Sequence, residues 1–291
     1  MERKHFIKLS IGVIGMTTLA GFRAFTDDLK EQDAVMPVLF MGHGSPMNGI
    51  EHNEFSAYWA KLARELPTTK AILVVSAHWL TRGTKITAMD SPRTIHDFGG
   101  FPDELFAVQY PAPGNPSLAK ETTEIIKSTQ VELDHDWGLD HGAWTIIRHM
   151  YPDASIPVLQ LSIDYTKGPQ YHYELARELS ALRKKGVLIM GSGNMVHNLR
   201  MVAWDKLDSP YGFDWAVEMN EVFKNKILNG NHKPLMNYEA LNKASRLAIP
   251  TPDHYYPLMY TLGLQGKDEE VSIFNDKLMA GSLSMTSVRI G

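Results

Sequence analysis

Two histidines follow directly on apolar segments that have the composition of buried strands. Val38–Met41 leads into His43, which has a glycine on each side, and Ile72–Val75 leads into His78. In α/β proteins, ligands bind in the crevice beyond the carboxyl ends of the sheet strands. Neutral imidazole is the commonest metal-binding side chain. A single histidine at a strand end is more often only hydrogen-bonded to backbone, but two in equivalent positions favour a metal site.

Three further histidines border glycine or proline turns. His197 follows the apolar run Val187–Met190 and a glycine turn, His254 opens an expected helix, and His141 stands in Asp-His-Gly. Glycine lets the backbone pass close to a ligand. The pattern predicts a site built from imidazoles of distant chain segments. We expect solvent exposure for four others, namely His52, His135, His172 and His232.

The composition removes several other chemistries. The chain has no cysteine, which excludes disulfides, thiolate nucleophiles and cysteine-type zinc sites. It has no G-x-S-x-G elbow, Walker loop, G-x-G-x-x-G or H-E-x-x-H motif. A net charge of -4 without a basic patch makes nucleic acid an unfavourable partner. Histidine and carboxylate ligands favour zinc or non-haem iron, and hence hydrolysis or oxygen activation.

The elements that position these residues alternate between strand and helix patterns. Strands are predicted at 36–41, 71–77, 85–89, 131–134, 156–161, 187–190, 270–274 and 283–289. Helices are predicted at 54–66, 117–129, 170–185 and 213–228. A further helix follows the predicted turn 136–142 and runs through His149, and another begins within 250–257. This order predicts one α/β domain. Its central mixed sheet is flanked by helices on both faces, and the metal site lies at the strand carboxyl ends.

Residues 1–35 have a different character. The segment 3–8, which contains the basic residues Arg3, Lys4 and Lys8, precedes the uncharged stretch 9–22, as in a secretory signal. This start is similar to a twin-arginine signal with lysine in place of the second arginine. The stretch is shorter than the ~20 residues of a membrane span, so no stable span is expected. The alternative interpretation is a short amphipathic extension. The sequence therefore favours neither a cytoplasmic nor a periplasmic location for the protein. Residues 23–35 are interpreted as a linker, and 36–291 as the catalytic domain.

Six motifs together resemble the DODA-type class III extradiol ring-cleavage dioxygenases, the 4,5-DOPA extradiol dioxygenase family. They cover the chain from Met36 to Gly291 in order. The motifs are Gly42-His43-Gly44-Ser45-Pro46, Ser76-Ala77-His78-Trp79, Ile95-His96-Asp97-Phe98-Gly99-Gly100-Phe101-Pro102, Trp137-Gly138-Leu139-Asp140-His141-Gly142, Gly193-Asn194-Met195-Val196-His197-Asn198 and Pro252-Asp253-His254-Tyr255.

The resemblance implies one divalent metal held by His43, His78 and His254. Members of the family are found with Zn²⁺, whereas ring cleavage requires Fe²⁺. His197 is implied as the acid/base residue, close enough to the metal to be a fourth ligand when zinc is bound. A base at this position accepts a catechol proton and later returns it.

The resemblance also implies that His141 contacts the substrate and takes part in catalysis, and that His96 lines the pocket mouth. Each role has a simpler alternative. Asp253 could replace His254 as the metal ligand, and His197 could be a purely structural ligand. His141 and His96 could have only a structural role in the loops that carry them. Four aromatic side chains are assigned to the core rather than to substrate binding: Trp59, Trp79, Trp144 and Tyr255.

The implied reaction is extradiol, 4,5-type cleavage of a catechol such as DOPA by O₂ at a mononuclear non-haem metal. The small-molecule partners would be the catechol and O₂. Two alternatives remain open at this point. One is a zinc-dependent hydrolase that uses the same histidines to activate water. The other is a non-catalytic relative that binds metal.

Overall fold

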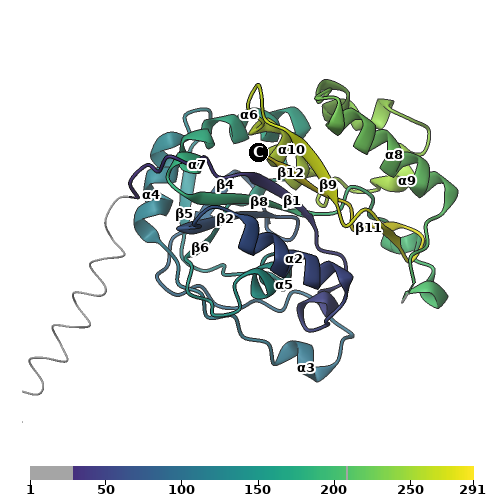
Figure 1. Ribbon diagram of the computed structural model, residues 1–291, viewed down its shortest axis with the longest axis horizontal. Helices are drawn as coiled ribbons and strands as arrows, with labels where there is room; N and C mark the ends of the chain where they lie inside the picture. The colour runs from purple at the N-terminus through teal and green to yellow at the C-terminus, as the bar shows by residue number, and fades with distance from the viewer. Residues whose placement is uncertain (1–28, 208) are drawn as a thin grey trace, which may run out of the picture.

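A six-stranded mixed sheet forms the centre of the molecule, in the strand order β6-β2-β8-β1-β12-β9 (Figure 1). The computed structural model describes residues 29–207 and 209–291. The first four strands are parallel, and β12 and β9 are antiparallel to their neighbours. Their bounds are Val158–Gln160 (β6), Ala71–Ser76 (β2), Val187–Gly193 (β8), Val38–Gly42 (β1), Ser287–Ile290 (β12) and Val271–Phe274 (β9).

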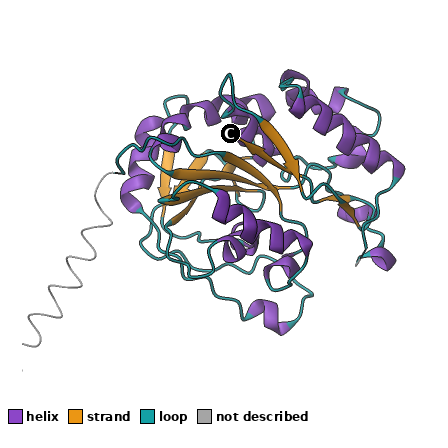
Figure 2. Ribbon diagram, in the orientation of Figure 1, coloured by secondary structure: helices purple, strands orange, loops and turns teal. Residues whose placement is uncertain are grey.

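Helices cover both faces of this sheet (Figure 2). Because successive strand side chains point to opposite faces, Leu39 and Met41 of β1 pack with the helices α2 (Glu54–Glu65) and α5 (His141–Met150). On the other face Val38 packs with α6 (Pro169–Glu178) and α7 (Ser180–Lys184). Phe40 packs there with α8 (Asp214–Leu228) and α10 (Tyr256–Gly263). Both faces of the strand are therefore apolar, as its sequence is. The predicted fold class is confirmed.

Short elements surround the main sheet. β4 (Thr84–Thr87) pairs with β5 (Val131–Asp134), β3 (Leu80–Thr81) with β7 (Ile163–Asp164), and β10 (Leu278–Met279) with β11 (Leu283–Ser284). The remaining α-helices are α3 (Asp103–Phe106), α4 (Pro116–Ile125) and α9 (Ser245–Ala248). The sequence did not predict β3, β7, β10, α3 or α9, because two to four residues are too few for a periodic pattern.

The register of the parallel strands brings the predicted site together. Gly42 of β1 pairs with Gly193 of β8, and Ser76 of β2 pairs with Ser192 of β8. The three strands thus end at the same edge. His43, His78 and the segment that contains His197 leave the sheet side by side.

Three local expectations need correction. His172 and His232 are buried, not exposed, and each has a tyrosine hydroxyl near its Nδ1. The predicted helix 170–185 is two helices that meet at Leu179. The helix expected within 250–257 begins at Tyr256, so His254 lies in the preceding turn.

The signal-like segment lies outside the described residues, which begin at Leu29. The end of the expected linker touches the domain. Leu29 packs against the core beside α6 and α7, and the Gln32 amide donates to the carbonyl of Lys184 at 2.8 Å. Among the helices the structure describes, none has the length and apolar character needed to cross a membrane.

Candidate metal centre

Imidazoles from five chain segments gather beyond the carboxyl ends of β1, β2 and β8. The ring centroids of His43, His78 and His254 lie 5.0–5.2 Å apart. His141 lies 3.9 Å from His78, and His197 lies 3.5 Å from His254. The structure therefore places five of the six predicted site histidines in one cluster.

The tautomer of His43 is set by hydrogen bonds behind the ring. Its Nδ1 lies 3.0 Å from the hydroxyl of Ser192, which itself donates its proton to the carbonyl of Gly142. Ser192 must therefore accept from the Nδ1–H of His43, which leaves Nε2 with a free lone pair. Asn48 also donates to the His43 carbonyl at 2.9 Å and holds the backbone there.

His78 faces His43 across the cluster. Their Nε2 atoms lie 3.2 Å apart. The Nδ1 of His78 lies 3.2 Å from Oδ2 of Asp97. The two rings thus present the same nitrogen to a shared point, and each has an oxygen acceptor at its other nitrogen.

His254 reaches the cluster from the turn before α10. Its Nδ1 is hydrogen-bonded to Oδ2 of Asp253. Its carbonyl accepts from the Asn194 amide at 3.0 Å, which ties this turn to the end of β8. A Cβ on Gly193 would lie 2.2 Å from that carbonyl oxygen, so the close approach requires glycine.

His141 is the first residue of α5, and Asp140 caps the helix. The carboxylate of Asp97 lies beside it. Oδ1 of Asp97 accepts from the His141 amide at 2.9 Å and lies 2.9 Å from Nδ1 of the ring. A Cβ on Gly142 would lie 2.9 Å from the His78 ring, so the following glycine lets α5 approach His78.

His197 leaves β8 and is held by its backbone, with its amide donating to the Ala248 carbonyl at 2.9 Å. Its half-buried ring stacks on His254 with the planes 7° apart.

Burial and crowding control protonation in the cluster. Burial, followed by repulsion from the neighbouring imidazoles, holds the pKa of His43 well below its usual value. Burial is also the main cause that lowers the pKa of His197 to about 2 and that of His254 to about 4. At neutral pH these rings are therefore neutral, which is the form that binds metal.

The pKa values of His78 and Asp97 are shifted in opposite directions by their mutual contact. Burial lowers the pKa of His78, but the neighbouring carboxylates, Asp97 first, outweigh it and the net pKa is raised. Burial raises the pKa of Asp97, and contacts with His141 and His78 more than reverse this, so its pKa is lowered. Asp97 is thus an ionised carboxylate between two imidazoles.

The residues fit a divalent metal. Two nitrogens bound to one tetrahedral ion at about 2.0–2.1 Å lie about 3.3 Å apart. The Nε2 atoms of His43 and His78 are 3.2 Å apart. An oxygen acceptor behind each ligand imidazole is the usual support for a metal site. Potential ligand atoms lie within 4.8 Å of one another in two triplets, His43-His78-His141 and His197-Asp253-His254. The predicted ligand triad takes His43 and His78 from the first triplet and His254 from the second.

His96 lies one aromatic layer away from this cluster. Its Nε2 donates to the carbonyl of Val108 at 2.9 Å, and its ring packs against Phe98, which in turn contacts His141. The four aromatic side chains assigned to the core are all at most 3% exposed, which confirms that assignment: Trp59, Trp79, Trp144 and Tyr255.

Sequence reasoning missed two supporting residues, Asp97 and Ser192. Both stand inside the motifs quoted above, but their contacts with His78, His141 and His43 span distant parts of the chain.

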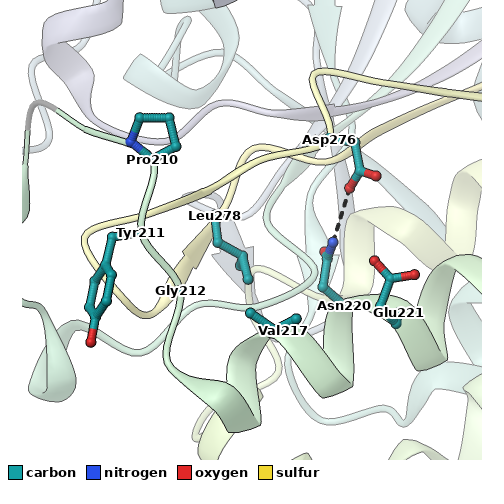
Figure 3. A pocket seen from close by; sticks show the side chains of 8 residues that line it. All are labelled: Pro210, Tyr211, Gly212, Val217, Asn220, Glu221, Asp276 and Leu278. Atoms are coloured by element: carbon teal, nitrogen blue, oxygen red, sulfur yellow. Dashed lines mark hydrogen bonds between the residues drawn. The ribbon is translucent and has the colours of Figure 1, made fainter.

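A separate surface hollow of about 290 Å³ lies between α8 and the segment that carries Asp276 and Leu278 (Figure 3). Its lining contains none of the clustered histidines. Asn220 donates to Asp276 at its edge, and Lys224 pairs with the same carboxylate. The hollow is thus separate from the metal centre.

Residues 36–290 match the family described as the catalytic LigB subunit of aromatic ring-opening dioxygenase. The chain belongs to this family and is an extradiol ring-cleavage dioxygenase, which confirms the family predicted from the motifs.

Individual relatives are similar in sequence to this protein over nearly its whole length. The 4,5-DOPA dioxygenase extradiol of Escherichia coli K12 is 50% identical over 268 residues, which is 91% of this chain and 98% of that protein. The protein of the same name from Beta vulgaris is 33% identical, over 90% of this chain and 98% of its own. A crystal structure of an E. coli K12 protein described as uncharacterized matches with a TM-score of 0.77 at 44% identity. It covers 88% of this chain and 100% of that one.

Proposed function

We propose that the protein cleaves the ring of DOPA or a related catechol in the extradiol, 4,5-type manner. One O₂ is consumed, the ring carbon–carbon bond beside the two hydroxyl-bearing carbons breaks, and both oxygen atoms enter the product. The observation that carries the proposal is the set of three imidazoles with Nδ1 next to Ser192, Asp97 and Asp253, their other nitrogens remaining for a metal. The relatives named 4,5-DOPA dioxygenase extradiol support the substrate class.

The proposed ligands are His43, His78 and His254, each through Nε2. When bound, Fe²⁺ supplies open coordination positions for two catechol oxygens and O₂, together with the redox chemistry that Zn²⁺ lacks. Three neutral imidazoles leave the positive charge of the site undiminished, which favours binding of an anionic catechol.

His197 is proposed to accept a catechol hydroxyl proton on its imidazole and to return it later. Burial keeps the pKa of this ring low, so it enters the reaction neutral and able to accept. The negative charge of the bound catechol raises that pKa and allows the ring to hold the proton.

His141 is proposed to contact the substrate and to assist proton transfer. With Nδ1 next to Asp97, its Nε2 is left for the reacting molecule. His96 is proposed to line the mouth of the pocket through the aromatic layer it shares with Phe98.

Oxygen uptake by the anaerobically Fe²⁺-reconstituted protein tests the proposal. DOPA should consume about one O₂ per molecule and give a yellow ring-opened product, with both atoms of ¹⁸O₂ incorporated. The matched controls are tyrosine and the O-methylated catechol, which cannot chelate through two oxygens and should be inert. The Zn²⁺-loaded protein should bind catechol without consuming oxygen.

A ferrous protein that is inert with every catechol tested would contradict the proposal. Hydrolysis of an ester or amide by the Zn²⁺ form, under the same conditions, would instead identify a zinc hydrolase.

A further inference from the structure

One carboxylate, that of Asp97, lies between two of the clustered imidazoles. Oδ2 lies 3.2 Å from Nδ1 of His78, and Oδ1 lies 2.9 Å from Nδ1 of His141. Oδ1 also accepts from the His141 amide at 2.9 Å. The His78 and His141 rings are 3.9 Å apart between centroids. Each oxygen of this one side chain thus lies within 3.2 Å of Nδ1 of a different imidazole.

The loop that carries Asp97 is fixed against the segment that enters α5. The indole Nε1 of Trp144 donates to the Ile95 carbonyl at 2.9 Å. The Ile95 amide donates to the Leu139 carbonyl at 2.7 Å, and the Leu139 amide to the Arg93 carbonyl at 2.8 Å. Hydrogen bonds to the backbone of Arg93 and Ile95, just before Asp97 in the chain, therefore help to position its carboxylate, in addition to its two imidazole partners.

The other proposed ligands have supports that serve one ring each. Asp253 contacts His254, and Ser192 contacts His43. Of these three supports, Asp97 is the one with a carboxylate oxygen 2.9 Å from a ring nitrogen of an imidazole that is not a proposed ligand, His141. A displacement of its carboxylate would therefore affect two functions together.

We propose that Asp97 is a positioning residue that couples the metal ligand His78 to the substrate-contacting His141. The inference rests on the proposed function for the roles of these two histidines, and adds that a single carboxylate makes the two roles depend on each other. Through Oδ2 it holds the His78 ring so that Nε2 meets the metal. Through Oδ1 it holds the His141 ring so that Nε2 meets the substrate.

The metal arm of the test compares two matched variants of the full chain, Asp97→Asn and Asp253→Asn. Each replaces a carboxylate beside one proposed ligand with the isosteric amide. Zinc affinity, measured by competition with a chromogenic chelator, should fall about 10–100-fold in both, the usual loss for such a supporting residue. Unchanged affinity in Asp97→Asn would overturn the proposal.

The coupling arm uses a double-mutant cycle with His141→Ala, measured at saturating Fe²⁺ so that metal loss does not contribute. Asp97→Asn should lower kcat for DOPA in the wild-type background and lower it much less when His141 is already absent, because one of its two partners has gone. Asp253→Asn removes a carboxylate that is hydrogen-bonded to His254 rather than to His141, so it should cost a similar factor in both backgrounds. Equal losses for Asp97→Asn in both backgrounds would show independent action and would overturn the coupling.

Two measurements keep the test decisive. Should Asp97→Asn fail to fold, judged by circular dichroism and its melting temperature, Asp97→Glu takes its place. It keeps the charge but moves the carboxylate by one methylene, and should also lose zinc affinity. If the wild-type protein cleaves no catechol, the proposed function fails. The cycle is then read from 4-nitrocatechol binding to the Zn²⁺ form, where additive losses overturn the coupling and non-additive losses support it.

Discussion

His197 and His254 stack face to face, with ring centroids 3.5 Å apart and planes inclined by 7°. An imidazole binds a metal in the plane of its ring. Two nearly parallel planes at this separation do not meet within bonding distance of either nitrogen, so one ring must turn before both can bind the same ion. The carboxylate of Asp253 on Nδ1 of His254 favours His254 as the ligand.

We therefore predict that His254→Ala, like His43→Ala and His78→Ala, lowers metal affinity by more than about 100-fold, beyond the effect of removing a supporting residue. Metal content by elemental analysis checks this, with exposed His52→Ala as the control that should keep full loading. Full loading in His254→Ala combined with loss in Asp253→Ala would move the third ligand to Asp253.

The same stacking predicts a different outcome for His197→Gln. This variant should retain Fe²⁺ and bind catechol, yet turn over about 10²–10⁴-fold more slowly, because it lacks the proton acceptor. Single-turnover kinetics on metal-saturated protein measure the effect. A variant purified without metal would show that His197 is a structural ligand.

The sequence predicted the positions of His43 and His78 because local apolar runs specify the buried strands that carry them. It could not predict Asp97 or Ser192 as their supports, since those contacts depend on loops and strands that meet only after folding. The error at His172 has a similar cause. Its helix is amphipathic, but the ring turns inward toward Tyr260, and sequence spacing does not distinguish a buried histidine from an exposed one.

His172 should make stability depend on pH. Burial, partly offset by the charge of Asp164, lowers its pKa to about 4. The unfolded chain takes up the proton near pH 6.5, so this contribution to stability is complete above that pH and is lost as the pH falls from about 6.5 toward 4. At pH 5 the loss is on the order of 2 kcal/mol.

His172→Gln should remove this part of the pH dependence. The difference in melting temperature between pH 7.5 and pH 5 should shrink by about 4–8 °C relative to wild type. His135→Gln, at an exposed position, is the control and should leave the difference unchanged. An equal pH dependence in wild type and His172→Gln would show that the buried ring does not titrate in this way.

The boundary of the catalytic domain, predicted at residues 35 and 36, can be tested with two truncations. In the described part of the chain, contacts with the domain begin at Leu29, which packs on the core, and include the Gln32 amide bond to Lys184. Lys70 also donates to the Lys30 carbonyl at 2.9 Å.

Deleting residues 1–28 preserves these contacts, so the melting temperature should stay within about 1 °C of the full chain, with unchanged zinc affinity. Deleting residues 1–35 removes partial burial of a leucine and a backbone hydrogen bond, together about 2 kcal/mol, which corresponds to a fall of about 4–8 °C. Zinc affinity should persist in both truncations, because the proposed ligands lie beyond residue 42. Equal melting temperatures for the two truncations would place the boundary at residue 36, and loss of folding on removal of residues 1–28 would show that the domain begins earlier in the chain.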